Sequence, residues 1–148
     1  MNTGSQLPTQ RREDAKNAKE ESATEINRVS AAVVDAALEV HREFGPGLLE
    51  SAYCAALTIE LEQRGWSVRR ECEVPCFYKG TSLGMSYRMD LVVCACVVVE
   101  VKAVQDLLPI HQAQLLTYLR LSGHRLGLLI NFNVPLLKGA IKRVVNRL

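Results

Sequence analysis

The chain has 148 residues, of which 48% are hydrophobic and 23% charged, and its formal net charge is +2. These values are those of a globular protein with one sizeable core, and so small a charge neither indicates nor excludes nucleic-acid binding. No apolar run approaches the roughly 18 residues of a membrane helix, so we expect no membrane span. Residues 1–21 have no apolar core typical of a signal peptide, so we expect a cytoplasmic protein.

The chain begins with a polar segment and continues with two predicted helices. Residues 1–23 are mixed in charge and have no apolar periodicity, which predicts a disordered tail before a folded domain at 24–148. From Thr24 to Phe44 apolar residues recur every three or four positions, which predicts a helix with Thr24 as its N-cap. Gly45-Pro46-Gly47 ends this helix, and a second helix is expected at about 48–64.

Strands dominate the remainder of the chain. Extended segments are predicted at 66–78, 83–94 and 96–104, with Lys79-Gly80 as a turn and Pro75 as the mark of an edge strand or bulge. A helix is expected at 109–121, between Pro109 and Gly123. Two more strands are expected, at 125–131 and about 140–146. This order predicts a mixed α/β or α+β fold.

Five cysteines lie at positions 54, 72, 76, 94 and 96. An odd number in a chain without a signal peptide argues against a disulfide framework. A metal site formed by Cys72, Cys76, Cys94 and Cys96 is one interpretation, although neither pair has the usual CxxC spacing. The favoured interpretation is that these cysteines pack as small apolar residues.

Three charged residues interrupt the apolar segment 89–102, which reads MDLVVCACVVVEVK. If Cys94-Ala95-Cys96 is a three-residue turn, positions whose numbers sum to 190 lie opposite each other, so Asp90 faces Glu100 and Lys102 lies on the same face. Two carboxylates at that separation suit a hard divalent cation such as Mg²⁺. Lys102 would then orient water or stabilise developing charge on a phosphate.

Two features leave this interpretation open. The turn contains no Gly, Asn or Asp, the residues that such turns favour. In addition, the charges are equally consistent with a structural ion pair at a sheet edge, between Glu100 and either Lys102 or Arg88.

Several motifs together resemble the PD-(D/E)XK nuclease superfamily. Asp90, followed after nine residues by Glu100-Val101-Lys102, resembles its D…E-X-K core, with Met89 in place of the Pro. The segment Gly47-Leu48-Leu49-Glu50-Ser51-Ala52-Tyr53 resembles the signature of the GxxExxY family within it. Residues 114–118 resemble the QxxxY motif of RecB-like members, and residues 126–133 resemble the closing segment of the GxxExxY family.

The resemblance implies a restriction-endonuclease-like fold, with a central mixed sheet flanked by helices and a metal site at one edge. It implies Mg²⁺ or Mn²⁺ as the cofactor. The implied metal ligands are Asp90, Glu100 and the backbone carbonyl of Val101, and the implied catalytic residues are Lys102, Glu50, Gln114 and Tyr118. Gln114 and Tyr118 are spaced i and i+4, so they share one face of a helix.

Structural roles are the alternative for the remaining motif residues. Tyr53 is expected to be a packed aromatic whose hydroxyl is hydrogen-bonded. Gly47 would serve the turn, and Glu50 would complement the helix dipole. Gln114 and Tyr118 would form a polar stripe on the helix.

The favoured function is a metal-dependent nuclease that acts on nucleic acid, with DNA preferred to RNA and a homodimer possible. The alternative is a nuclease-like fold that binds nucleic acid or assembles with protein without turnover, because a fold does not prove an activity. A basic C-terminal set, Lys138, Lys142, Arg143 and Arg147, would either contact the phosphate backbone or form a solvated face.

Overall fold

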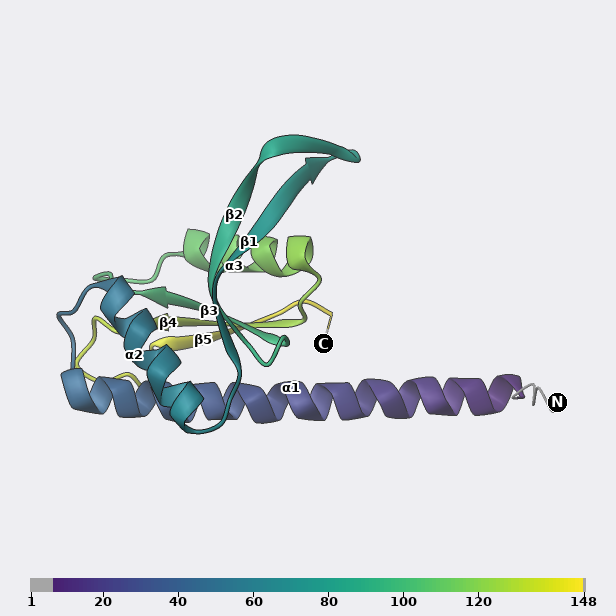
Figure 1. Cartoon of the computed structure of the whole chain (residues 1–148), viewed down its shortest axis with the longest axis horizontal. Helices are drawn as coiled ribbons and strands as arrows, with labels where there is room; N and C mark the ends of the chain where they lie inside the picture. The colour runs from purple at the N-terminus through teal and green to yellow at the C-terminus, as the bar shows by residue number, and fades with distance from the viewer. Residues whose placement is uncertain (1–6, 148) are drawn as a thin grey trace.

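The computed structural model describes residues 7–147. The chain forms three layers, with one sheet between two layers of helices (Figure 1). The elements are α1 (Pro8–Phe44), α2 (Glu50–Gln63), β1 (Val68–Tyr78), β2 (Thr81–Val93), β3 (Val97–Lys102), α3 (Pro109–Ser122), β4 (Leu126–Asn131) and β5 (Ile141–Val145). The strands lie in the order β1-β2-β3-β4-β5, and β3 and β4 form the one parallel pair of this sheet. The predicted mixed α/β fold with a central mixed sheet flanked by helices is confirmed.

The two faces of the sheet are covered by different helices. Apolar residues of α1 and α2 pack with Leu91, Val99 and other side chains of one face, whereas α3 packs with Val98 and others of the opposite face. Helix α3 approaches β4 closely at Gly127, where an added Cβ would lie 2.9 Å from the Leu115 side chain. Adjacent residues of β3 therefore belong to different layers, as the alternation of strand side chains requires.

Helix α1 corrects the prediction for the N-terminal segment. It begins at Pro8 rather than at Thr24, whose hydroxyl donates to the Glu20 carbonyl within the helix instead of capping it. The expectation of a tail without regular structure is therefore wrong over residues 8–23, and residues 1–6 lie outside the described part. Good helix formers extend the helix from its packed half even though residues 8–23 contribute no buried side chain.

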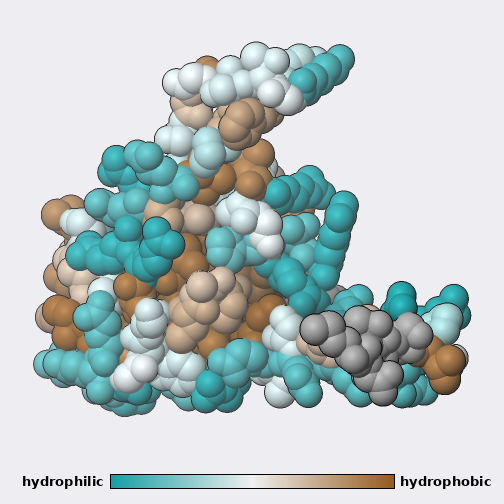
Figure 2. All heavy atoms as spheres, turned by 45° about the vertical axis from the view of Figure 1, so that its right-hand side comes forward, coloured by the Kyte–Doolittle hydropathy of each residue, from teal (hydrophilic) through white to brown (hydrophobic). Residues whose placement is uncertain are grey.

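This extension makes α1 37 residues long, or about 55 Å. Its buried residues begin at Ile26, so the N-terminal part projects from the body, and Figure 2 shows this projection as mainly hydrophilic. The division of the chain at residue 24 into a tail and a nuclease-like domain remains a proposal. Among residues 7–147 the structure contains no helix with the length and apolarity needed to cross a bilayer.

The turn between β2 and β3 has the predicted length and register. Leu91 pairs with Val99, and Val93 pairs with Val97, so paired positions sum to 190. The turn closes with a 3.0 Å hydrogen bond from the Cys96 N–H to the Val93 carbonyl. Cys94 and Ala95 adopt positive φ angles of 49° and 56°, which supply the backbone conformation that Gly or Asn usually provides.

We expect Ala95→Gly to stabilise the protein by about 1 kcal/mol, because glycine has no Cβ to oppose a positive φ. Urea denaturation measures this change. The control is Ala55→Gly inside α2, which we expect to destabilise by about 0.5–1 kcal/mol because glycine is unfavourable in a helix. A loss of stability in Ala95→Gly would contradict the turn conformation.

Strands β1 and β2 extend beyond the sheet as a two-stranded arm (Figures 1 and 2). The register shifts between Pro75 and Phe77, which confirms the predicted bulge, and β1 is the predicted edge strand. The arm closes at Lys79-Gly80, and both residues have positive φ. Because this arm diverges from β3, the backbone at the base of the arm is open on one side.

Candidate active site

The candidate site lies where β2 separates from β3, at Asp90. The last backbone pair before this point is Leu91 with Val99, and the next contacts use side chains. Glu100 Oε1 accepts a 3.1 Å hydrogen bond from the Asp90 N–H, and Asp90 Oδ2 accepts a 2.8 Å hydrogen bond from the Val101 N–H. The predicted juxtaposition of Asp90 and Glu100 is therefore confirmed, and each carboxylate is held by the backbone beside the other.

The atoms around this point suit a hard cation. The hydrogen bonds of the described residues use one oxygen of each carboxylate, which leaves the second oxygen of Asp90 and of Glu100 for a ligand. The N–H and C=O of one strand residue point to the same side. Because the Val101 N–H points to Asp90, the Val101 carbonyl faces the same gap, which is the space where β2 separates from β3. Two carboxylates and one carbonyl form an all-oxygen donor set that fits Mg²⁺ or Mn²⁺.

The surroundings of Glu100 disfavour its negative charge. Glu100 is only 6% exposed, and its burial, followed by the negative charge of Asp90, raises the pKa of its carboxyl to about 8. Lys102 opposes this shift, but it makes no ion pair with Glu100. A bound cation would favour the charged form of both carboxylates.

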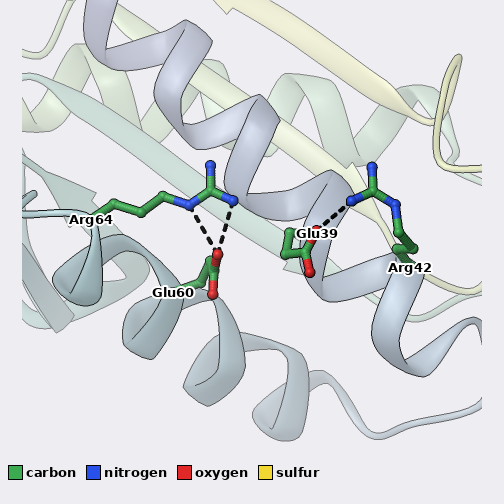
Figure 3. Close-up of polar contacts among 4 residues, drawn as sticks. All are labelled: Glu39, Arg42, Glu60 and Arg64. Atoms are coloured by element: carbon green, nitrogen blue, oxygen red, sulfur yellow. Dashed lines mark hydrogen bonds and ion pairs between the residues drawn. The ribbon is translucent and has the colours of Figure 1, made fainter.

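The ion pairs of residues 7–147 lie elsewhere. Figure 3 shows two of them, Glu39 with Arg42 in α1 and Glu60 of α2 with Arg64, the residue that follows this helix. Arg88 pairs with Glu71 at 3.8 Å and not with Glu100. The alternative of a structural ion pair that uses Glu100 with Lys102 or Arg88 is thus contradicted.

Lys102 is half-buried at the end of β3, and a side chain that sequence reasoning missed holds the chain beyond it. Asn131, 2% exposed, accepts a hydrogen bond from the Val104 N–H at 3.1 Å and donates to the Val104 carbonyl at 2.9 Å. The Phe132 N–H donates to the Lys102 carbonyl. The signal was a polar residue that ends the buried segment LGLLIN, where an unpartnered amide would be costly.

We expect Asn131→Ala to lower the free energy of unfolding by about 2 kcal/mol, because the N–H and carbonyl of the half-buried Val104 lose their partners. Thermal and urea denaturation measure the loss. Asn133→Ala serves as the control, since Asn133 is exposed and we expect a change within about 0.5 kcal/mol. Equal stability of the two variants would contradict the stabilising role of the hydrogen bonds between the Asn131 side chain and the Val104 backbone.

Tyr118 approaches the carboxylates from α3. It is 8% exposed, and its ring lies 5.4 Å from that of Tyr87. Burial raises the pKa of its hydroxyl, and the negative charges of Glu100 and Asp90 raise it further. Gln114 lies one turn earlier on α3, is exposed, and makes no side-chain hydrogen bond to another described residue. The structure thus places Tyr118 in the electrostatic field of the pair.

Glu50 reaches the site from the other helical layer. It is the first residue of α2 and lines a pocket of about 250 Å³ with Ser51, Cys54, Arg70, Glu71 and Asp90. Cys54 is buried there, and its pKa is raised to about 12, first by burial and then by the charge of Asp90. Sequence reasoning did not place Cys54, Arg70 or Glu71 at the site, because the spacing of single strands does not show which residues of β1 lie next to α2.

Tyr53, in the same motif as Glu50, has the predicted structural role. It is fully buried and stacks on Phe132 at 4.5 Å between ring centroids. Its hydroxyl donates to the Gly45 carbonyl at 2.5 Å and accepts from the Leu48 N–H at 3.2 Å. Gly47 has a φ of 109°, which requires glycine. These two motif residues shape the turn that places Glu50.

The C-terminal basic residues lie apart from the pocket. Lys142 and Arg143 are on β5, at the sheet edge opposite β1. Arg143 binds side-chain oxygens of Asn27 and Ser30 in α1, so part of this set is structural.

No metal site formed by cysteines is present in the described part of the chain. Cys54, Cys72, Cys76, Cys94 and Cys96 are all free, and no three Cys, His, Asp or Glu side chains among residues 7–147 converge as metal ligands. The interpretation of Cys72, Cys76, Cys94 and Cys96 as a metal site is therefore wrong. The donor set at Asp90 has two carboxylates only and is completed by the Val101 backbone.

Comparison with known families supports the resemblance seen in the motifs. The PD-(D/E)XK nuclease superfamily matches residues 27–144, a span that begins within α1 and ends within β5 and contains the whole candidate site. Searches of curated proteins and of solved structures found no match. On the extent of the family match, the chain belongs to the PD-(D/E)XK nuclease superfamily.

Proposed function

We propose that this protein is a metal-dependent nuclease of the GxxExxY type that hydrolyses phosphodiester bonds, with DNA as the preferred substrate. The observation that carries the proposal is the paired arrangement of Asp90 and Glu100, two carboxylates fixed side by side with no cationic side chain of residues 7–147 in ion-pair contact. Membership of the nuclease superfamily supports the choice of nucleic acid.

In this proposal Asp90, Glu100 and the Val101 carbonyl hold Mg²⁺ or Mn²⁺. When bound, the ion supplies Lewis-acid activation of the phosphate and of the attacking water. Lys102, on the same strand as Glu100, stabilises the negative charge that develops on the phosphate. The ordinary pKa of a tyrosine is about 10 and that of Tyr118 is raised, so its hydroxyl keeps its proton at neutral pH and is available as a hydrogen-bond donor.

Glu50 and Gln114 complete the proposed set from the two helical layers. Glu50 lines the same pocket as Asp90 and orients water or the ion through its carboxylate. Gln114 is exposed on α3 and contacts the nucleic-acid backbone beside the site. A homodimer and a cytoplasmic location also remain proposals.

The test is a cleavage assay with Mn²⁺ on single- and double-stranded DNA and RNA, with wild-type protein beside Asp90→Asn. We expect cleavage by the wild type alone, because the variant loses one ligand charge while its volume is nearly unchanged. The substrate cleaved fastest identifies the preferred nucleic acid.

Absence of cleavage by folded wild-type protein would contradict the proposal. Binding of oligonucleotides without turnover would then favour the alternative of a nuclease-like binding or assembly module. Equal cleavage by Asp90→Asn would instead exclude the site described here.

A further inference from the structure

One cationic side chain lines the acidic pocket beside Asp90. Arg70 lies on β1 opposite Leu91, whose side chain belongs to the layer of α1 and α2. It lines the pocket together with Glu50 of α2 and Asp90 of β2. Its neighbour Arg69 lines a different pocket on the α3 side, as strand alternation requires.

The pocket has more acidic than basic side chains, and Arg70 is not paired with any of the acidic ones. Three carboxylates line it, those of Glu50, Glu71 and Asp90. Glu71 is paired with Arg88, whereas Arg70 forms no ion pair with any of residues 7–147. The positive charge of Arg70 nevertheless acts within the pocket, because it lowers the pKa of the Cys54 thiol against the opposing carboxylates.

We propose that Arg70 binds a non-bridging phosphate oxygen of a nucleic-acid strand that enters this pocket. This inference rests on the proposed function, and it adds an anion-binding residue that none of the motifs contains. A phosphodiester that approaches three carboxylates is repelled unless cations compensate. A guanidinium without an ion-pair partner offers two parallel N–H donors to a phosphate.

Arg70 is also accessible to a polymeric substrate. Its side chain is exposed, and the pocket lies at the base of the β1–β2 arm, next to the gap that Asp90 and Glu100 share. Arg70 is therefore a positioning residue: it holds the strand so that the adjacent phosphodiester lies against the carboxylate pair.

The test measures binding separately from turnover. Anisotropy of a fluorescent single-stranded oligonucleotide and of the matching duplex is recorded with Ca²⁺ in place of Mn²⁺, over a series of NaCl concentrations. We expect Arg70→Gln to weaken binding of the preferred form about tenfold and to reduce the slope of log affinity against log salt by about 0.7–0.9, the contribution of one phosphate contact. We expect Arg70→Lys to recover the slope and part of the affinity.

Arg69→Gln is the matched control, because it removes the same charge from the adjacent position on the opposite face of β1. We expect it to leave the salt slope within error of the wild type. An unchanged slope in Arg70→Gln, equal effects of both substitutions, or no binding by the wild type would each overturn the inference.

The assay also separates this inference from the nuclease proposal. Binding that depends on Arg70, together with no Mn²⁺-dependent cleavage, supports the anion site and contradicts the nuclease. Cleavage with an unchanged KM and salt slope in Arg70→Gln supports the nuclease and overturns the role of Arg70.

Discussion

Replacement of Lys102 by Ala is expected to lower the Mn²⁺-dependent cleavage rate by at least about 100-fold. The substitution removes the positive charge that stabilises the negative charge developing on the phosphate. Metal binding should persist, since Asp90, Glu100 and the Val101 carbonyl are retained. Mn²⁺ affinity should even rise, because Lys102 acts on Glu100 electrostatically and its positive charge repels a cation. Single-turnover cleavage and Mn²⁺ titration measure the two effects.

The matched control for this substitution is Lys142→Ala. Lys142 is an exposed lysine on β5, at the other end of the strand order from β1. We expect its removal to change the cleavage rate less than about threefold. Wild-type cleavage by Lys102→Ala would remove Lys102 from the catalytic set, and loss of metal binding in that variant would show that its role is structural.

Replacement of Glu100 by Gln is expected to stabilise the metal-free protein at alkaline pH. The folded-state pKa of Glu100 is about 8, against an ordinary value of 4.5, so the folded state retains a proton that the unfolded state has lost. Between about pH 4.5 and pH 8 the free energy of unfolding therefore falls as the pH rises. In EDTA at pH 9 we expect Glu100→Gln to exceed the wild type by more than about 1 kcal/mol, the equivalent of one pKa unit.

The difference in stability between the wild type and Glu100→Gln should disappear at low pH and should change when metal is added. At pH 4, below the ordinary and the folded-state pKa of Glu100, the side chain of residue 100 is largely neutral in the wild type and neutral in the variant. The two proteins should therefore have nearly equal stability. Mn²⁺ at pH 9 should stabilise the wild type and not the variant, because a ligand that binds only the folded state raises its stability. Glu73→Gln, an exposed site on β1, is the control. Lower stability of Glu100→Gln in EDTA at pH 9 would contradict the burial and the charge repulsion described for this pair.

Much of the β-sheet followed from local pattern. The spacing of Asp90 and Glu100 around a three-residue turn predicted their register, because hairpin pairing depends on few residues. The turn could form without Gly or Asn because Cys94 and Ala95 accept positive φ. Pro75 marked a real bulge for the reason expected, since proline cannot complete a strand ladder.

The parts that could not be predicted depend on contacts between distant segments. The N-terminal half of α1 has no buried face, so apolar periodicity gave no sign of a helix there. The role of Asn131 depends on Val104, 27 positions away, and the placement of Arg70 depends on how α2 packs over β1. Even so, the motif spacing identified both carboxylates that the structure places side by side.

The most direct test of the central claim is a calorimetric titration of metal-free protein with Mn²⁺, wild type beside Asp90→Asn, at a pH above the pKa of Glu100. If Asp90 and Glu100 form a divalent-cation site, the wild type will show saturable binding that the variant lacks. Glu71→Gln, which changes a carboxylate of the pocket that Asp90 lines but not a proposed metal ligand, should bind as the wild type does. No saturable binding by the wild type, or equal binding by Asp90→Asn, would contradict the account.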